Sequence, residues 1–162
     1  MESARTTLAI TRKIMSKQLG IILPNLGNNQ LAFFTMLNVP PLIQRGIDTV
    51  LFFEDNERPI MKPPCAIMNA SELWDFPGDV IATTLNNATY LGNLIKAKRR
   101  ILYLWDLEWL RHNKNFIRNV EILRSNIELA ARSESHKKAI ETYCNKEVKY
   151  VIEDCDFSKV ME

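Results

Sequence analysis

The sequence has no long apolar run, few cysteines and histidines, and little net charge. None of its apolar stretches approaches the roughly 20 residues that cross a bilayer, so we expect no membrane-spanning helix. The three cysteines, Cys65, Cys144 and Cys155, lack CxxC spacing, which indicates reduced thiols in a cytoplasmic protein and argues against a disulfide framework or a zinc site. With only two histidines we expect no metal centre, and a net charge of +2 is too small to indicate nucleic-acid binding by itself.

Two phosphate-binding signatures are also missing. The glycines of G-x-G-x-x-G do not follow the first β-prone run, which argues against NAD or FAD. The Walker lysine pattern is absent as well, which excludes a P-loop NTPase. What remains is an ordinary composition for a globular domain, with 162 residues, 46% hydrophobic and 25% charged, and enough length to bury a core.

The chain divides into a short lead-in and one domain. Residues 1–18 carry Arg5, Arg12, Lys13 and Lys17, and their apolar run at 8–10 is too short for a secretory signal. We expect an amphipathic helix or a frayed lead-in there. Residues 19–162 then form the domain.

Within the domain, short β-prone runs alternate with helical stretches. The expected strands are residues 19–23, 49–53, 65–68, 79–83, 100–105, 127–131 and 148–152. The expected helices are residues 28–45, broken or restarted at Pro40-Pro41, then 86–98, 113–124 and 135–144, with a turn or helix at 71–74. Apolar strands alternating with helices predict a Rossmann-like, doubly wound α/β domain with a mainly parallel sheet and helices on both faces.

Ligands of such sheets bind beyond the carboxyl ends of the strands. After the first strand, Gly27 lets the backbone approach a ligand, and Asn28 and Asn29 can cap the following helix, whose amide end favours anions. Further candidate acceptor-binding or phosphate-binding residues lie in the later turns: Asn86, Glu108, Trp109, Ser133 and Ser135.

Asp106 is the candidate catalytic residue. It follows the strongest predicted strand and lies among Trp105, Glu108 and Trp109. A carboxylate beside indole rings is a candidate general base whose pKa is raised by partial burial, and aromatic faces beside polar groups suit sugars or bases. The alternative is that Asp106 caps a helix while the tryptophans fill the core, and the sequence favours neither interpretation.

The order of these segments resembles the N-terminal domain of GT-B glycosyltransferases. The resemblance rests on the Gly-Asn turn at 27–28, on Asp-Val-Ile-Ala at 79–82 and on Arg-Ile-Leu-Tyr-Leu-Trp-Asp at 100–106, followed by residues 130–144 and 150–160. Residues 153–157 stand where that family crosses to its second domain, without the usual glycine. A narrower likeness is to phage DNA β-glucosyltransferases, in which Gly-Asn-Asn follows the first strand and an aspartate after a tyrosine-rich strand is the catalytic base, with Asp106 as the nearest match.

The resemblance implies the acceptor-side half of a hexosyltransferase, with the chain ending where a donor-binding domain would begin. Such a half transfers sugar only when a partner chain, or another copy in a homo-oligomer, completes the active site. It implies no cofactor in this chain and a nucleotide-sugar donor such as UDP-glucose in the completed enzyme. The implied acceptor is DNA or a glycan, in the cytoplasm, including that of a phage-infected bacterial host.

Two other functions stay open. One is a non-catalytic binding module derived from a glycosyltransferase domain, in which the basic cluster Lys96, Lys98, Arg99 and Arg100 could touch phosphates, although cations also suit a solvated helix end. The other is a small nucleotide-binding α/β protein in which the Gly27 turn holds a phosphate.

Overall fold

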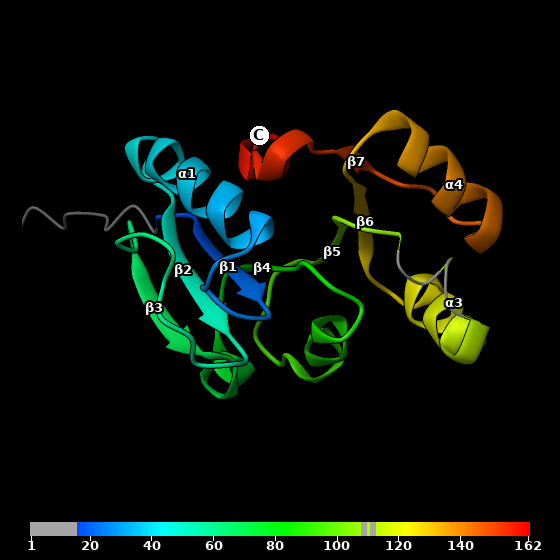
Figure 1. Cartoon of the computed structure of the whole chain (residues 1–162), viewed down its shortest axis with the longest axis horizontal. Helices are drawn as coiled ribbons and strands as arrows, with labels where there is room; N and C mark the ends of the chain where they lie inside the picture. The colour runs from blue at the N-terminus through cyan, green and yellow to red at the C-terminus, as the bar shows by residue number, and fades with distance from the viewer. Residues whose placement is uncertain (1–15, 108–109, 111–112) are drawn as a thin grey trace, which may run out of the picture.

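A single sheet of parallel strands forms the centre of the computed structural model, which describes residues 16–107, 110 and 113–162. The seven strands are β1 (Gln18–Leu23), β2 (Asp48–Phe53), β3 (Ala66–Asn69), β4 (Asp79–Ala82), β5 (Arg100–Leu104), β6 (Glu128–Ala131) and β7 (Tyr150–Val151). They lie in the order β3-β2-β1-β4-β5-β6-β7 (Figure 1). The predicted Rossmann-like α/β class is confirmed.

Both faces of the sheet are covered, which is why its central strands read as continuous apolar runs. In β1, Leu19, Ile21 and Leu23 point into one core, and Ile22 points into the other. The first core is closed by α1 (Gln30–Gln44) and two short 3-10 segments, η4 (Glu153–Cys155) and η5 (Phe157–Val160). The second is closed by η1 (Ala70–Asp75), η2 (Asn87–Asn93), α3 (Phe116–Arg124) and α4 (Glu134–Cys144).

The two prolines do not break the first helix, contrary to the expectation from the sequence. α1 runs continuously through Pro40 and Pro41 to Gln44. Both prolines are exposed and stand in the last part of the helix, where the Pro41 carbonyl still accepts a hydrogen bond from the Arg45 N–H (3.2 Å). Packing on the buried side, by Val39 and Leu42, holds the helical path against the local preference.

The α-helix expected at residues 86–98 is absent, and the short 3-10 segment η2 occupies only Asn87–Asn93. Asn87 is fully buried, and its Oδ1 accepts hydrogen bonds from the N–H groups of Thr83 (3.0 Å) and Thr84 (2.9 Å). This side chain turns the backbone tightly against the end of β4. Ile95 lies beyond the end of η2 and is 81% exposed.

Two further elements are shorter than expected. α3 begins at Phe116, after the 3-10 turn η3 (Asn113–Asn115), and buries Val120 and Leu123 but leaves Ile117 exposed. The last strand pairs only through Tyr150–Val151 instead of residues 148–152. Val148 and Ile152, on either side of β7, are buried but do not pair in the sheet. The run of apolar residues therefore made the strand look longer than it is.

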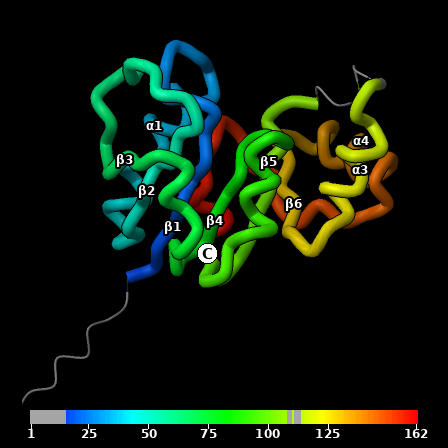
Figure 2. The backbone as a smooth tube through the Cα atoms, turned by 90° about the horizontal axis from the view of Figure 1, so that it is seen from below, coloured from blue at the N-terminus to red at the C-terminus, as the bar shows by residue number. Residues whose placement is uncertain are grey.

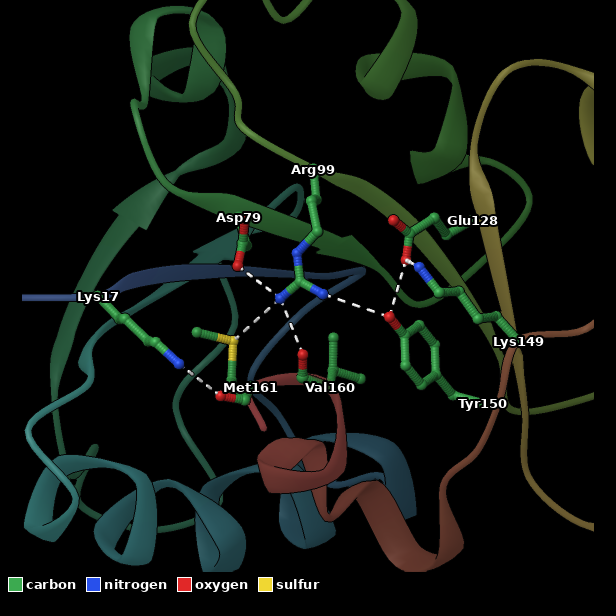
Figure 3. Close-up of polar contacts among 8 residues, drawn as sticks. All are labelled: Lys17, Asp79, Arg99, Glu128, Lys149, Tyr150, Val160 and Met161. Atoms are coloured by element: carbon green, nitrogen blue, oxygen red, sulfur yellow. Dashed lines mark hydrogen bonds and ion pairs between the residues drawn. The ribbon is translucent and has the colours of Figure 1, made fainter.

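The C-terminus lies near β4 in the tube view (Figure 2). Arg99 ties this C-terminal segment to the amino ends of the strands (Figure 3). Its Nη2 donates to the Asp79 carboxylate (2.7 Å) and to the Val160 carbonyl (2.8 Å), and its Nη1 donates to the Tyr150 hydroxyl (3.3 Å). The Tyr150 hydroxyl in turn donates to Glu128 (3.0 Å). The hydrogen bond to Asp79 raises the pKa of Arg99, so the guanidinium is a permanent charge at this junction.

This network divides the basic cluster expected from the sequence. Arg99 is committed to the junction, and Lys96 forms an ion pair with Asp75 (3.2 Å). Arg100 lines a separate groove in the helix layer. Lys98 stays beside Arg99, whereas Arg100 lies in a different hollow, so the four cations are not gathered in one place.

The proposed lead-in falls mostly on residues 1–15, which lie outside the described residues. Lys17 is described, and its Nζ donates to the Met161 carbonyl (2.8 Å), next to the Arg99 network (Figure 3). Across the described part of the chain, no helix has the length and apolar character needed to cross a membrane.

Candidate functional site

A cavity opens beyond the carboxyl ends of β1, β4 and β5. The chain leaves β1 toward β2 and β3 and later returns to place β4 on the other side of β1. The connections after β1 and β4 therefore diverge, which is where open α/β sheets bind ligands. The cavity has a volume of about 350 Å³ and is lined by Leu31, Thr83, Thr84, Leu85, Asn86, Leu104, Trp105, Asp106, Asn115 and Asn119.

The wall after β4 is held rigidly from behind. Asn87 binds the N–H groups of Thr83 and Thr84, and the Thr83 hydroxyl donates to the Ile22 carbonyl of β1 (2.6 Å). Buried polar groups that are satisfied in this way fix a loop in one conformation. Asn86 follows on this wall with an exposed side chain, so its amide is available to a ligand.

The wall after β5 carries the candidate base. Asp106 is exposed, so the partial burial expected from the sequence is absent. Its Oδ1 accepts a hydrogen bond from the Leu107 N–H (2.7 Å). The carboxylate thus lines the cavity at its open side, in reach of solvent.

Trp105 is clamped beside Asp106. The Phe34 ring lies 5.8 Å from it on one side, and the Arg132 guanidinium stacks over the indole at 3.9 Å from the ring centre. A guanidinium over an indole is a favourable cation–π arrangement. The cavity therefore has a fixed aromatic wall with a cation directly behind it.

Two asparagines that the sequence did not single out complete the rim. Asn115 precedes α3 and Asn119 lies in its first turn, four residues later, so both side chains point to one side of the helix. Each amide offers both a donor and an acceptor. The spacing of these two residues was the only signal of their role in the sequence.

The turn after β1 reaches the cavity only through its helix. Asn29 caps α1, its Oδ1 accepting from the Ala32 N–H (2.8 Å), and Leu31 of the first turn lines the cavity. Gly27 faces elsewhere, because a Cβ placed on it would lie 2.2 Å from the Glu57 carboxylate. The space in front of Gly27 is therefore filled by the Glu57 side chain instead of a ligand. Asn28, the next residue, is exposed.

The remaining candidates lie apart from the cavity or outside the described residues. Ser133 caps α4, accepting from the His136 N–H (3.2 Å), and its hydroxyl lies 3.0 Å from that of Ser135. These serines follow β6 and do not line the cavity. Glu108 and Trp109 lie outside the described residues.

Glu54 is a polar group near the site that was not among the candidates from the sequence. It follows β2, next to β1, and its Oε1 is shielded from water without a hydrogen-bond partner. Burial raises the pKa of Glu54, an effect that the adjacent Asn87 amide only partly offsets. Its place directly after a strand that neighbours the switch point was the available signal.

Replacing Glu54 with glutamine should remove a pH dependence of stability. Because the folded protein holds this proton more tightly than the unfolded chain, its free energy of unfolding falls as pH rises above the ordinary value of 4.5 toward the raised pKa. Glu54→Gln should flatten that slope and raise the free energy of unfolding at pH 7 by up to about 1 kcal/mol. Urea titrations between pH 4 and 8 measure this, with Glu72→Gln, an exposed glutamate in η1, as control. A slope unchanged by Glu54→Gln would contradict the assignment.

Among the described residues, no three histidine, cysteine, aspartate or glutamate side chains come together as a metal site. All three cysteines are free thiols, and burial raises the pKa of Cys65 and of Cys155 to about 11. The cavity offers instead one carboxylate, several amides and an indole, which suits a ligand rich in hydroxyl groups.

The sequence matches no protein-family model, and no curated protein or solved structure shows significant similarity to it. The chemistry of the cavity is therefore what indicates a function.

Proposed function

We propose that this chain is the acceptor-side half of a glycosyltransferase, whose active site is completed by a donor-binding domain on a separate chain. The observation that carries the proposal is the meeting of Asp106, Trp105 and three asparagine amides, Asn86, Asn115 and Asn119, in one cavity at the switch point. Amides and carboxylates match sugar hydroxyls, and an indole face packs against the apolar face of a sugar ring or a base.

In this proposal Asp106 acts as general base. It takes the proton from an acceptor hydroxyl while that oxygen attacks the anomeric carbon of the donor sugar. The bond from the anomeric carbon to the phosphate oxygen breaks, and the nucleoside diphosphate leaves with the bonding electrons. UDP-glucose is a donor of the required class, and a hydroxylated base in DNA or a glycan is the acceptor.

The exposure of Asp106 favours an active site that is shared between this chain and a donor-binding domain. Asp106 is exposed to solvent, and closing a site over it would exclude water and strengthen the electrostatic interactions inside. The donor-binding domain would supply that closure. The same exposure favours, as the second candidate, a binding module that holds its ligand without any transfer.

One pair of variants separates the two candidates. Acceptor binding is measured by calorimetry with a glycan and with a DNA oligonucleotide, and glucosyl transfer from UDP-glucose is measured with the proteins that co-purify from the source cell. Asp106→Asn should leave the dissociation constant within about twofold, since the amide keeps an acceptor oxygen, and should reduce transfer by about 10²–10⁴-fold. Asp75→Asn, an exposed aspartate away from the cavity, is the matched control.

Two results would contradict the proposal. If neither acceptor class binds the wild-type chain, the cavity is not an acceptor site. If acceptors bind and no transfer occurs with any co-purifying protein, the binding module is the correct interpretation. The nucleotide-binding alternative would need nucleotides to displace Glu57 from the Gly27 turn, where like charges repel.

A further inference from the structure

A second hollow lies in the helix layer, between η2 and α3, and shares no lining residue with the first cavity. It has a volume of about 550 Å³. Its walls are Ala88, Thr89, Leu91, Gly92, Arg100, Arg118, Glu121, Ile122, Ser125, Asn126 and Ile127. We call it the arginine groove, after Arg100 and Arg118.

One N–H group of Arg100 has no hydrogen-bond acceptor. Its Nη2 donates to the Leu94 carbonyl, but its Nε is shielded from water and has no hydrogen-bond partner. An unpaired donor on a buried charged group is costly, and native proteins satisfy nearly all such groups.

The groove is also positively charged. Arg118 is exposed and forms no ion pair with any residue that the structure describes, and Glu121 is the one acidic residue in the lining. Behind the wall, Lys146 Nζ donates to the carbonyls of Ser125 (2.6 Å) and Ile127 (2.5 Å). Two cations and one carboxylate therefore line the groove itself.

The hydroxyl groups that line the groove already donate hydrogen bonds to backbone carbonyls. Thr89 donates to the Asn86 carbonyl (2.7 Å), and Ser125 donates to the Ile122 carbonyl (2.6 Å). The side-chain donors left for a ligand are the two guanidinium groups and the Asn126 amide. Next to them, the space in front of Gly92 is open, since a Cβ placed there would meet nothing within 4 Å.

We infer that the arginine groove binds the phosphate group of a small molecule. The exposed Arg118 guanidinium can bind phosphate oxygens in a bidentate pair, and Arg100 adds a second positive charge to the wall of the groove. A phosphate has enough oxygens to engage both arginines at once, whereas a carboxylate satisfies a single fork. The site stands apart from the acceptor cavity, so it does not depend on the function proposed above.

The test is a calorimetric titration of the full chain at low salt with inorganic phosphate and with uridine 5′-monophosphate. We expect saturable binding of one molecule and a dissociation constant raised about tenfold by Arg118→Gln, which removes one charged partner. Equal affinity for the two probes would identify free phosphate as sufficient, and tighter binding of the nucleotide would identify a phosphate ester.

Arg100→Gln should weaken binding at least as much. Because that side chain is partly buried and its loss can perturb folding, Arg118→Gln alone is sufficient to decide. Arg58→Gln, an exposed arginine in the loop after β2, should leave binding unchanged. Absence of saturable binding, or equal weakening by Arg58→Gln and Arg118→Gln, would overturn the inference.

Discussion

Replacing Arg99 with methionine is expected to lower the free energy of unfolding by about 2–3 kcal/mol. The substitution keeps much of the side-chain volume but leaves Asp79, whose side chain is only 13% exposed, without its cation. It also leaves the Val160 carbonyl without its donor. Urea denaturation followed by circular dichroism measures the change.

A double substitution tests the cause. If the lost stability reflects the uncompensated Asp79 carboxylate, Arg99→Met combined with Asp79→Leu should recover part of it, because that buried carboxylate is then removed as well. Lys96→Met removes a cation from the exposed pair with Asp75 and should change stability by less than about 0.5 kcal/mol. An effect of Arg99→Met no larger than that of Lys96→Met would show that the junction contributes little.

Phe157→Ala is expected to have the largest effect, about 3–4 kcal/mol. Phe157 is fully buried in the core on the α1 side of the sheet. It packs edge-on against Tyr103, with ring centres 5.2 Å apart. The segment before it is unfavourable by itself, because Asp154 and Cys155 have left-handed backbones, with φ of 47° and 60°. The docked phenylalanine must therefore offset that cost as well as order the chain end.

Two variants control for Phe157→Ala in the same denaturation measurement. Phe157→Leu keeps most of the buried area and should cost about half as much. Phe33→Ala removes a partly exposed phenylalanine from α1 and should cost less than either. If Phe157→Ala matches Phe33→Ala, the C-terminal segment is not part of the cooperative core.

The fold class was accessible from the sequence because β1, β2, β4 and β5 are apolar on both faces, a pattern that few other structures produce. The predictions of individual elements that were wrong failed for local reasons. Pro40 and Pro41 disfavour a helix by themselves, and only the packing of their buried neighbours overrides that preference. The 3-10 form of η2 depends on the hydrogen bonds of the Asn87 amide. The spacing of apolar residues in the sequence carries no information about those bonds.

The candidate site was predictable only in part. Asp106 and Asn86 were found because both follow strands that adjoin the switch point. Asn115 and Asn119 come from a helix whose position over the cavity depends on the tertiary packing of α3. Ser133 and Ser135 also follow a strand, but β6 is one strand further from the switch point, so the same rule placed them outside the cavity.

The strand order leaves β3 at one edge of the sheet, with all four of its residues exposed. Unpaired strand edges invite other chains to add a strand, and Ile67 and Met68 make this edge apolar. Two features limit the risk: the edge is only four residues long, and Pro63 and Pro64 just before it have no N–H to donate. Pairing of chains through β3 is therefore expected only in concentrated solution, and Met68→Lys should suppress it.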